Sequence, residues 1–191
     1  MNIQLEKISK QFDEKEVFKD ITLTFLEGQI NCLMGASGIG KTTLIHIMMG
    51  LMKQDFGEIT GLSGKRISVV FQEDRLIEHW DAIDNIKLVC GKEISEDGII
   101  RELEAVGLYE LKNKPVSKLS GGMRRRVAIV RALLSSSDLV IMDEPFKGLD
   151  DELRHNVIEY VREKVMGRTL IVVTHEKEDL ILLQANLVTM D

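Results

Sequence analysis

The 191-residue sequence predicts an α/β fold in which helices cover a mostly parallel sheet. Two observations carry this prediction: short apolar runs recur along the chain, and segments whose apolar residues have helical spacing lie between these runs. A third observation is the alternation of apolar and polar residues within residues 3–25, which predicts a half-exposed antiparallel sheet near the N-terminus.

The core strands are predicted from four runs that are apolar on both faces, as in a parallel sheet covered on two sides. These runs are residues 30–34, 67–71, 139–142 and 170–173. Helical spacing indicates helices at residues 42–52, 99–106, 123–134 and 152–165. The stretch from about residue 73 to residue 123 is polar and mostly helical, and we interpret it as a helical subdomain inserted into one domain that spans residues 1–191.

The composition indicates a folded chain without a general attraction to nucleic acid. Hydrophobic residues make up 44% of the sequence, which is ample for a packed core, and the formal net charge is -6. Nucleic-acid binding usually requires a basic face, so we expect no nucleic-acid partner. No apolar run is long enough to span a bilayer, and residues 1–16 lack the apolar segment of a signal peptide, so we expect a chain that stays in the cytosol.

The segment from residue 35 to residue 42 reads GASGIGKT and fits the phosphate-loop pattern G-x-x-x-x-G-K-[ST]. It lies between a predicted strand and a predicted helix, which is the context that the pattern requires. Glycines let backbone N–H groups converge on phosphate oxygens, and the helix adds the positive end of its dipole. We expect Lys41 to reach the β- and γ-phosphates of a nucleotide and the Thr42 hydroxyl to ligate Mg²⁺. The residues expected to contact the nucleotide are Gly35, Ser37, Gly38, Gly40, Lys41, Thr42 and Thr43.

Two adjacent carboxylates follow the predicted strand at residues 139–142. Asp143 and Glu144 lie at the end of this strand, where the ligands of parallel sheets collect. Asp143 fits a ligand of Mg²⁺ or of a Mg²⁺-bound water, and Glu144 fits a general base for an attacking water. Together with the phosphate loop, these residues predict a P-loop NTPase (RecA-like) fold. They also predict that the protein hydrolyses a nucleoside triphosphate.

The sequence between these two motifs resembles one known family. Residues 118–134 read KLSGGMRRRVAIVRALL, and LSGGM resembles the LSGGQ signature of the nucleotide-binding subunits of ABC (ATP-binding cassette) transporters. Ser120 is also a good helix N-cap, and the two glycines after it expose backbone N–H groups. The resemblance implies a head-to-tail dimer in which Ser120 and Gly122 of one copy complete the ATP site of a second copy.

The resemblance extends over nearly the whole chain and assigns four further positions. Phe12 lies where the family places an aromatic ring that stacks on adenine, although the family more often has Tyr there; a core or surface aromatic is the alternative interpretation. Gln72 matches a glutamine that contacts Mg²⁺ or the water and begins the segment facing the membrane subunit. Asp150 matches the aspartate of the D-loop. His175 matches the switch histidine that contacts the γ-phosphate.

As a family member, the chain would bind ATP with Mg²⁺ and power transport through a separate membrane permease at the cytoplasmic face of the membrane. Import with an external substrate-binding protein is the expected direction, because residues 71–76 and 80–86, LSGGM and DEPFKGLD resemble the ATPases of nitrate, sulfonate and taurine importers. Trp80 either helps to dock the permease or packs the helical subdomain. Two other functions stay open: a soluble ABC ATPase outside transport, and a regulatory module that holds ATP without turnover.

Overall fold

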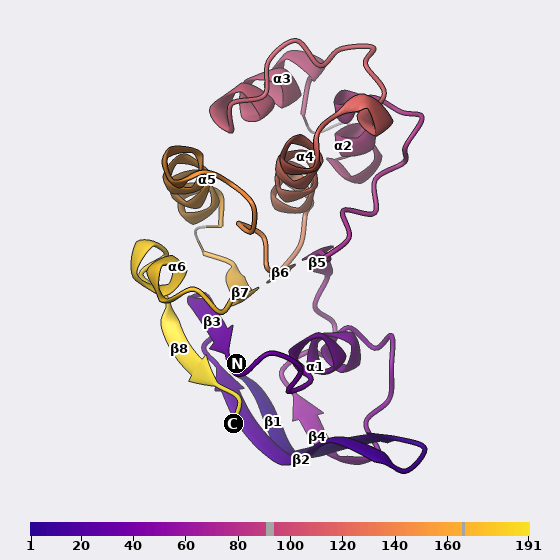
Figure 1. The fold of residues 1–191 in the computed structure, drawn as a ribbon, viewed down its shortest axis with the longest axis vertical. Helices are drawn as coiled ribbons and strands as arrows, with labels where there is room; N and C mark the ends of the chain where they lie inside the picture. The colour runs from indigo at the N-terminus through magenta and orange to yellow at the C-terminus, as the bar shows by residue number, and fades with distance from the viewer. Residues whose placement is uncertain (91–93, 166) are drawn as a thin grey trace.

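The structure is a computed structural model that describes residues 1–90, 94–165 and 167–191. A five-stranded parallel sheet lies in the middle of the molecule, with helices α2 to α6 on one side and helix α1 with a three-stranded antiparallel sheet on the other (Figure 1). The α/β fold class predicted from the sequence is confirmed by this arrangement.

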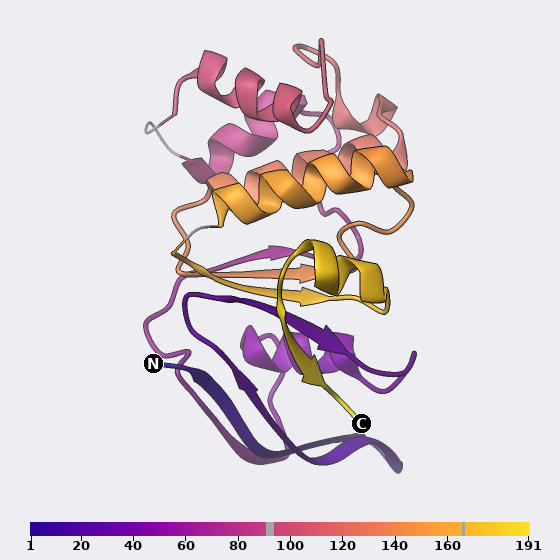
Figure 2. The same ribbon diagram turned by 90° about the vertical axis from the view of Figure 1, so that its left-hand side faces the viewer.

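The parallel sheet has the strand order β5-β6-β7-β3-β8. Its strands are β3 (Ile30–Met34), β5 (Ile67–Val70), β6 (Leu139–Asp143), β7 (Thr169–Val173) and β8 (Asn186–Thr189). The strand arrows of β5, β6 and β7 point the same way in Figure 2. The first four strands overlap the four apolar runs, and the central strands β6 and β7 are buried along their whole length, as the two-sided apolar pattern predicts.

The antiparallel sheet has the order β2-β1-β4. Strands β1 (Ile3–Phe12) and β2 (Lys15–Phe25) pair antiparallel, as the alternating N-terminal pattern predicts, and β4 (Phe56–Thr60) pairs with the other edge of β1. Gly57 in β4 has a φ of +88°, and a Cβ there would lie 2.4 Å from the carbonyl oxygen of Lys7. A glycine is therefore required where β4 crosses a bulge of β1.

The helices are α1 (Lys41–Met48), α2 (Ala82–Cys90), α3 (Glu96–Ala105), α4 (Gly121–Leu134), α5 (Asp151–Lys164) and α6 (Lys177–Leu182), with a 3₁₀ turn at Val116–Lys118. Helix α1 ends four residues before the predicted end at residue 52. Gly50 has a φ of 70°, and its N–H donates to the carbonyl of Ile47 at 2.9 Å, so a left-handed glycine terminates the helix. No helix in the described part of the chain is long and apolar enough to cross a membrane.

Alternate residues of the central strands point into two separate cores. Val140, Met142 and Val172 face the helical side, where they pack with α2, α4 and α5. Leu139 and Ile141 face the opposite side, where they pack with α1 and the antiparallel sheet. Helix α1 is thus held between two sheets, and the phosphate loop that precedes it is fixed at both of its ends.

Candidate nucleotide site

The predicted phosphate loop joins β3 to α1 through two left-handed glycines. Gly38 has a φ of 80° and Gly40 has a φ of 104°, a region that side chains with a Cβ rarely adopt. Gly40 is also the N-cap of α1, and the first turn of this helix contains no acidic side chain. The positive end of the helix is therefore available to an anion that binds at the loop.

The lysine of the phosphate-loop pattern contacts the backbone of its own loop. Lys41 Nζ donates to the carbonyl oxygens of Gly35 at 2.7 Å and of Ala36 at 2.8 Å. Gly35 serves packing: a Cβ there would lie 2.4 Å from the carbonyl oxygen of Met190, which follows β8. The missing side chain lets the C-terminal segment approach the loop closely.

Ten of the predicted site residues meet at one cavity of about 630 Å³. They come from the phosphate loop, from the segment after β5, from the end of β6 and from the turn after β7, so the arrangement depends on the parallel order of these strands. The predicted residues that line the cavity are Ser37, Gly38, Gly40, Lys41, Thr42, Thr43, Gln72, Asp143, Glu144 and His175.

Two of the three residues predicted to hold Mg²⁺ are in direct contact, and the third lines the same cavity. Thr42 Oγ1 donates to Asp143 Oδ2 at 2.9 Å, and Gln72 lines the same cavity. Asp143 is only 5% exposed, and burial raises the pKa of its carboxyl group despite the hydrogen bond from Thr42. Among the described residues no three His, Cys, Asp or Glu side chains form a closed metal site. One carboxylate and a hydroxyl beside a phosphate loop fit Mg²⁺, which is usually shared between a few protein oxygens and the phosphates of a substrate.

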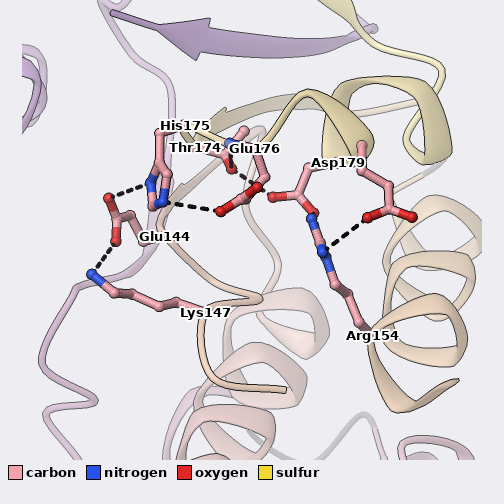
Figure 3. Close-up of polar contacts among 8 residues, drawn as sticks. Glu144, Lys147, Arg154, Thr174, His175, Glu176 and Asp179 are labelled. Carbon is pink, nitrogen blue, oxygen red and sulfur yellow. Dashed lines mark hydrogen bonds and ion pairs between the residues drawn. The ribbon is translucent and has the colours of Figure 1, made fainter. Parts of the chain in front are cut away.

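Glu144 is held in an uncommon backbone conformation at the cavity. Its φ is 47°, and its N–H donates to the carbonyl of Val173 at 2.9 Å, which ties the turn after β6 to β7. Both carboxylate oxygens are engaged: Oε1 lies 3.2 Å from His175 Nδ1, and Oε2 accepts from Lys147 Nζ at 2.9 Å (Figure 3). Burial alone would raise the pKa of Glu144, but Lys147 and His175 together outweigh it and lower the pKa below its usual range.

The turn that carries His175 rests on a buried ion pair. Asp179 on α6 is 3% exposed, accepts from Thr174 Oγ1 at 2.5 Å, and accepts from Arg154 Nε at 2.9 Å (Figure 3). Thr174 Oγ1 in turn accepts from the backbone N–H of Glu176 at 3.1 Å. Arg154 belongs to the first turn of α5, directly after the D-loop, so this pair joins the D-loop to the histidine turn.

The start of the Gln72 segment is attached to helix α4. Arg125 donates to the carbonyl oxygens of Phe71 and Gln72, and its Nη1 lies 3.3 Å from Asp74 Oδ1. Arg131, six residues further along α4, donates to the carbonyls of Asp74 and Arg75 at 3.1 and 3.0 Å. The arginines of the signature helix thus fix the segment that begins with Gln72.

The remaining predicted residues lie outside the cavity. Phe12 is 45% exposed at the end of β1, with Lys10 Nζ 5.3 Å from its ring centre, and its contact with adenine stays a prediction. Ser120 caps α4 by accepting from Met123 N–H at 3.3 Å, and Gly122 lies in the first turn of this helix. Asp150 caps α5 by accepting from Leu153 N–H at 3.0 Å.

Sequence reasoning missed three features of the site: Lys147, the Arg154–Asp179 pair, and Val17, which lines the cavity. A local signal exists only for Lys147. Pro145 follows Glu144, and proline is favoured at the second position of a β-turn, which brings the first and fourth side chains together.

The fold and the site define a P-loop nucleotide-binding cassette. The family described as ABC transporter matches residues 18–147, and the chain belongs to this family. The arginine transport ATP-binding protein ArtM of Bacillus subtilis is 34% identical over 91% of this chain and 81% of its own length.

The spermidine/putrescine import ATP-binding protein PotA of Spiroplasma citri is 34% identical over 99% of this chain, and the chain spans 59% of the length of that relative. A solved putative ABC transporter ATP-binding protein from Pyrococcus furiosus superposes with a TM-score of 0.81 at 26% identity, over 93% of this chain and 92% of the other. The ATP-binding cassette MJ0796, solved as a dimer with ADP and Pi, gives a TM-score of 0.82 at 26% identity. The match covers 94% of this chain and 90% of the other.

Proposed function

We propose that this chain is the ATP-binding and ATP-hydrolysing subunit of an ABC importer, folded as one cassette domain over residues 1–191. One observation carries the proposal: the loop lysine, the Thr42–Asp143 pair, Glu144 and His175 come from three separate segments and line one cavity. The described architecture and the family membership support the same function.

The phosphate loop supplies the binding half of the site. Backbone N–H groups of the loop and the start of α1 would hold the phosphates, and Lys41 would move from the carbonyls of its own loop to the β- and γ-phosphate oxygens. Thr42 and Asp143, with Gln72, would hold Mg²⁺, whose charge offsets the negative charge of the phosphates.

Glu144 and His175 supply the hydrolytic half. Glu144 accepts the proton of the attacking water at Oε1 or Oε2, and the charge that develops on the transferred phosphoryl group is stabilised by Lys41 and His175. His175 already contacts Glu144 at 3.2 Å, so the base and the γ-phosphate contact belong to one polar cluster.

The signature residues fit a site shared between two copies. Ser120 and Gly122 lie at the start of α4 and outside the cavity of their own chain, and MJ0796 was solved as a dimer. We place Ser120 and Gly122 of one copy against the ATP of the other, with Asp150 nearby. ATP then stabilises the closed pair, because the added contacts exist only while the γ-phosphate is present.

The transport partners follow from the family and from the names of the relatives. The named relatives are import or transport ATP-binding proteins for polyamines, arginine and sulfate or thiosulfate, cargoes of different charge. We propose a permease partner at the cytoplasmic face of the membrane and an external substrate-binding protein. Within the importers, residues 71–76 and 80–86, LSGGM and DEPFKGLD favour the nitrate, sulfonate and taurine group.

Steady-state ATP hydrolysis by the purified chain with Mg²⁺ tests the proposal. Glu144→Gln is expected to lower kcat by about 10² to 10⁴-fold with ATP still bound, and Lys41→Ala is expected to abolish ATP binding. Lys112→Met, a change at an exposed lysine outside the nucleotide cavity, is expected to leave kcat unchanged. Equal turnover by wild type and Glu144→Gln would favour the regulatory module, and co-purification with DNA or ribosomes would favour the soluble ABC ATPase.

A further inference from the structure

Glu144 has two side-chain partners in Figure 3, His175 and Lys147, and Lys147 is the partner for which the sequence predicted no role. Lys147 also lines the nucleotide cavity. Its Nζ lies 2.9 Å from Glu144 Oε2, and Lys147 forms no other ion pair within the part of the chain that the structure describes. The contact falls on the carboxylate that the proposed function makes the general base.

The backbone places Lys147 beside Glu144. Residues 144–147 form a turn in which the N–H of Lys147 approaches the carbonyl oxygen of Glu144 at 3.4 Å, with Pro145 at the second position. Phe146, the third residue, is 3% exposed and anchors the turn in the core. Gly148 follows with a φ of 78°, which folds the chain back. The turn therefore holds both side chains on the same side of the cavity.

The two partners of Glu144 differ in what else they contact. His175 uses Nδ1 toward Glu144 Oε1 and Nε2 toward Glu176 Oε1 at 3.1 Å, so its position is shared between two carboxylates. Of these two carboxylates, Lys147 contacts only Glu144. It donates to Oε2, whereas His175 contacts Oε1. Because Lys147 restrains Oε2, the carboxylate group of Glu144 cannot rotate freely, and Oε1 stays beside His175.

Lys41 does not perform this task, because its Nζ is bound to the carbonyls of Gly35 and Ala36. The cavity wall thus carries one lysine directed at the phosphate loop and a second directed at the base.

We propose that Lys147 is a positioning residue for ATP hydrolysis, which orients the Glu144 carboxylate toward the attacking water. The inference rests on the proposed function, in which Glu144 is the base. A general base must be within hydrogen-bond reach of its water, and a displacement of about 1 Å costs on the order of 10²-fold in rate. Since His175 still restrains Oε1, we expect the loss of Lys147 alone to cost about tenfold in kcat.

The test measures kcat and KM for Mg-ATP in the variants Lys147→Met and Lys147→Arg. Each variant is made in two backgrounds, the wild-type chain and the Glu144→Gln chain. Lys147→Met is expected to lower kcat about tenfold with KM within about twofold of wild type. Lys147→Arg, which keeps the charge and a donor, is expected to restore kcat to within about threefold. With Glu144→Gln, removing Lys147 is expected to change the residual rate by less than about twofold, because the residue acts through the carboxylate. Lys112→Met, whose lysine is exposed to a similar degree and also pairs with a glutamate, is the matched control.

Three outcomes would overturn the assignment. An unchanged kcat in Lys147→Met would show that the ion pair does not orient the base. A rise in KM of about tenfold that persists with Glu144→Gln would show that Lys147 binds a phosphate directly. Failure of Lys147→Arg to restore kcat would show that the positive charge and the hydrogen-bond donor at position 147 do not determine the rate. If instead Glu144→Gln hydrolyses ATP as fast as wild type, the proposed function fails and the role of Lys147 fails with it.

Discussion

Replacement of Asp179 by Asn tests whether the buried ion pair beneath the histidine turn stabilises the fold. Asp179 is 3% exposed and accepts from both Thr174 and Arg154, and the Arg154 side chain is 12% exposed. Asn keeps the size of the side chain and one acceptor oxygen. The substitution therefore removes the charge that faces Arg154 and leaves the packing almost unchanged.

The size of the effect follows from what Arg154 retains. Removing one partner of a fully buried pair costs about 3–5 kcal/mol because the other charge is left uncompensated. Arg154 keeps Glu178 at 3.2 Å, but the Glu178 side chain is 55% exposed and screened by water, where such a pair is worth about 0–1 kcal/mol. We therefore expect Asp179→Asn to lower the free energy of unfolding by about 2–4 kcal/mol.

Urea unfolding followed by circular dichroism measures this change, with the slope against urea unchanged. Glu178→Gln is the matched control: it makes the same chemical change on the exposed partner of Arg154 and is expected to cost less than about 1 kcal/mol. The double variant Arg154→Met with Asp179→Asn should be less destabilised than the sum of the two single variants. Equal losses in Asp179→Asn and Glu178→Gln would show that burial of the Arg154–Asp179 pair does not determine its contribution to stability.

Three further predictions concern the loop, the metal site and the helical segment. Gly35→Ala should lower the free energy of unfolding by about 1–3 kcal/mol in the same urea assay, because its Cβ would lie 2.4 Å from the Met190 carbonyl oxygen, whereas Gly121→Ala, with open space, should be neutral or stabilising. Thr42→Val should weaken binding of Mg-ATP at least tenfold by calorimetry and change binding of ATP in EDTA much less, because it removes one oxygen ligand. Two lysines lower the pKa of Glu96 from 4.5 to about 2, so its stabilising contribution is present above pH 4.5 and is lost as the pH falls toward 2. The difference in melting temperature between wild type and Glu96→Gln should shrink over that pH range and in high salt.

The sequence predicts the central strands well because their apolar faces leave little choice of environment. Strands β6 and β7 are apolar on both sides and are buried on both sides. The phosphate loop is equally local: its glycines, lysine and threonine are contiguous, so one pattern specifies both the strand-to-helix turn and its chemistry. Such features need no knowledge of distant contacts.

The features that sequence reasoning missed depend on partners far along the chain. Strand β4 contains Gly57 and polar residues, and it forms because β1 offers an edge about fifty residues earlier in the sequence. Strand β8 is short and half-exposed, and it pairs with β3, which lies about 150 residues earlier in the sequence. The Arg154–Asp179 pair likewise joins residues from two helices, and no spacing pattern predicts it.

The cluster of Asp143, Glu144, Thr42 and His175 could be predicted only in part, because it depends on both local sequence patterns and contacts between distant residues. Asp143 and Glu144 are readable as strand-end carboxylates, yet only the fold places Thr42 at 2.9 Å from Asp143 and His175 at 3.2 Å from Glu144. The order of β6, β7 and β3 in the sheet brings these segments together.

The most direct test of the whole account is the oligomeric state of Glu144→Gln by light scattering, measured with Mg-ATP and with Mg-ADP. We expect the molar mass to double with Mg-ATP and not with Mg-ADP. We also expect that adding Ser120→Phe, which blocks the signature surface, prevents the doubling while ATP still binds. A Glu144→Gln protein that binds Mg-ATP tightly and keeps the molar mass of one chain would contradict the ATP-driven pairing of two copies on which the proposed motor depends.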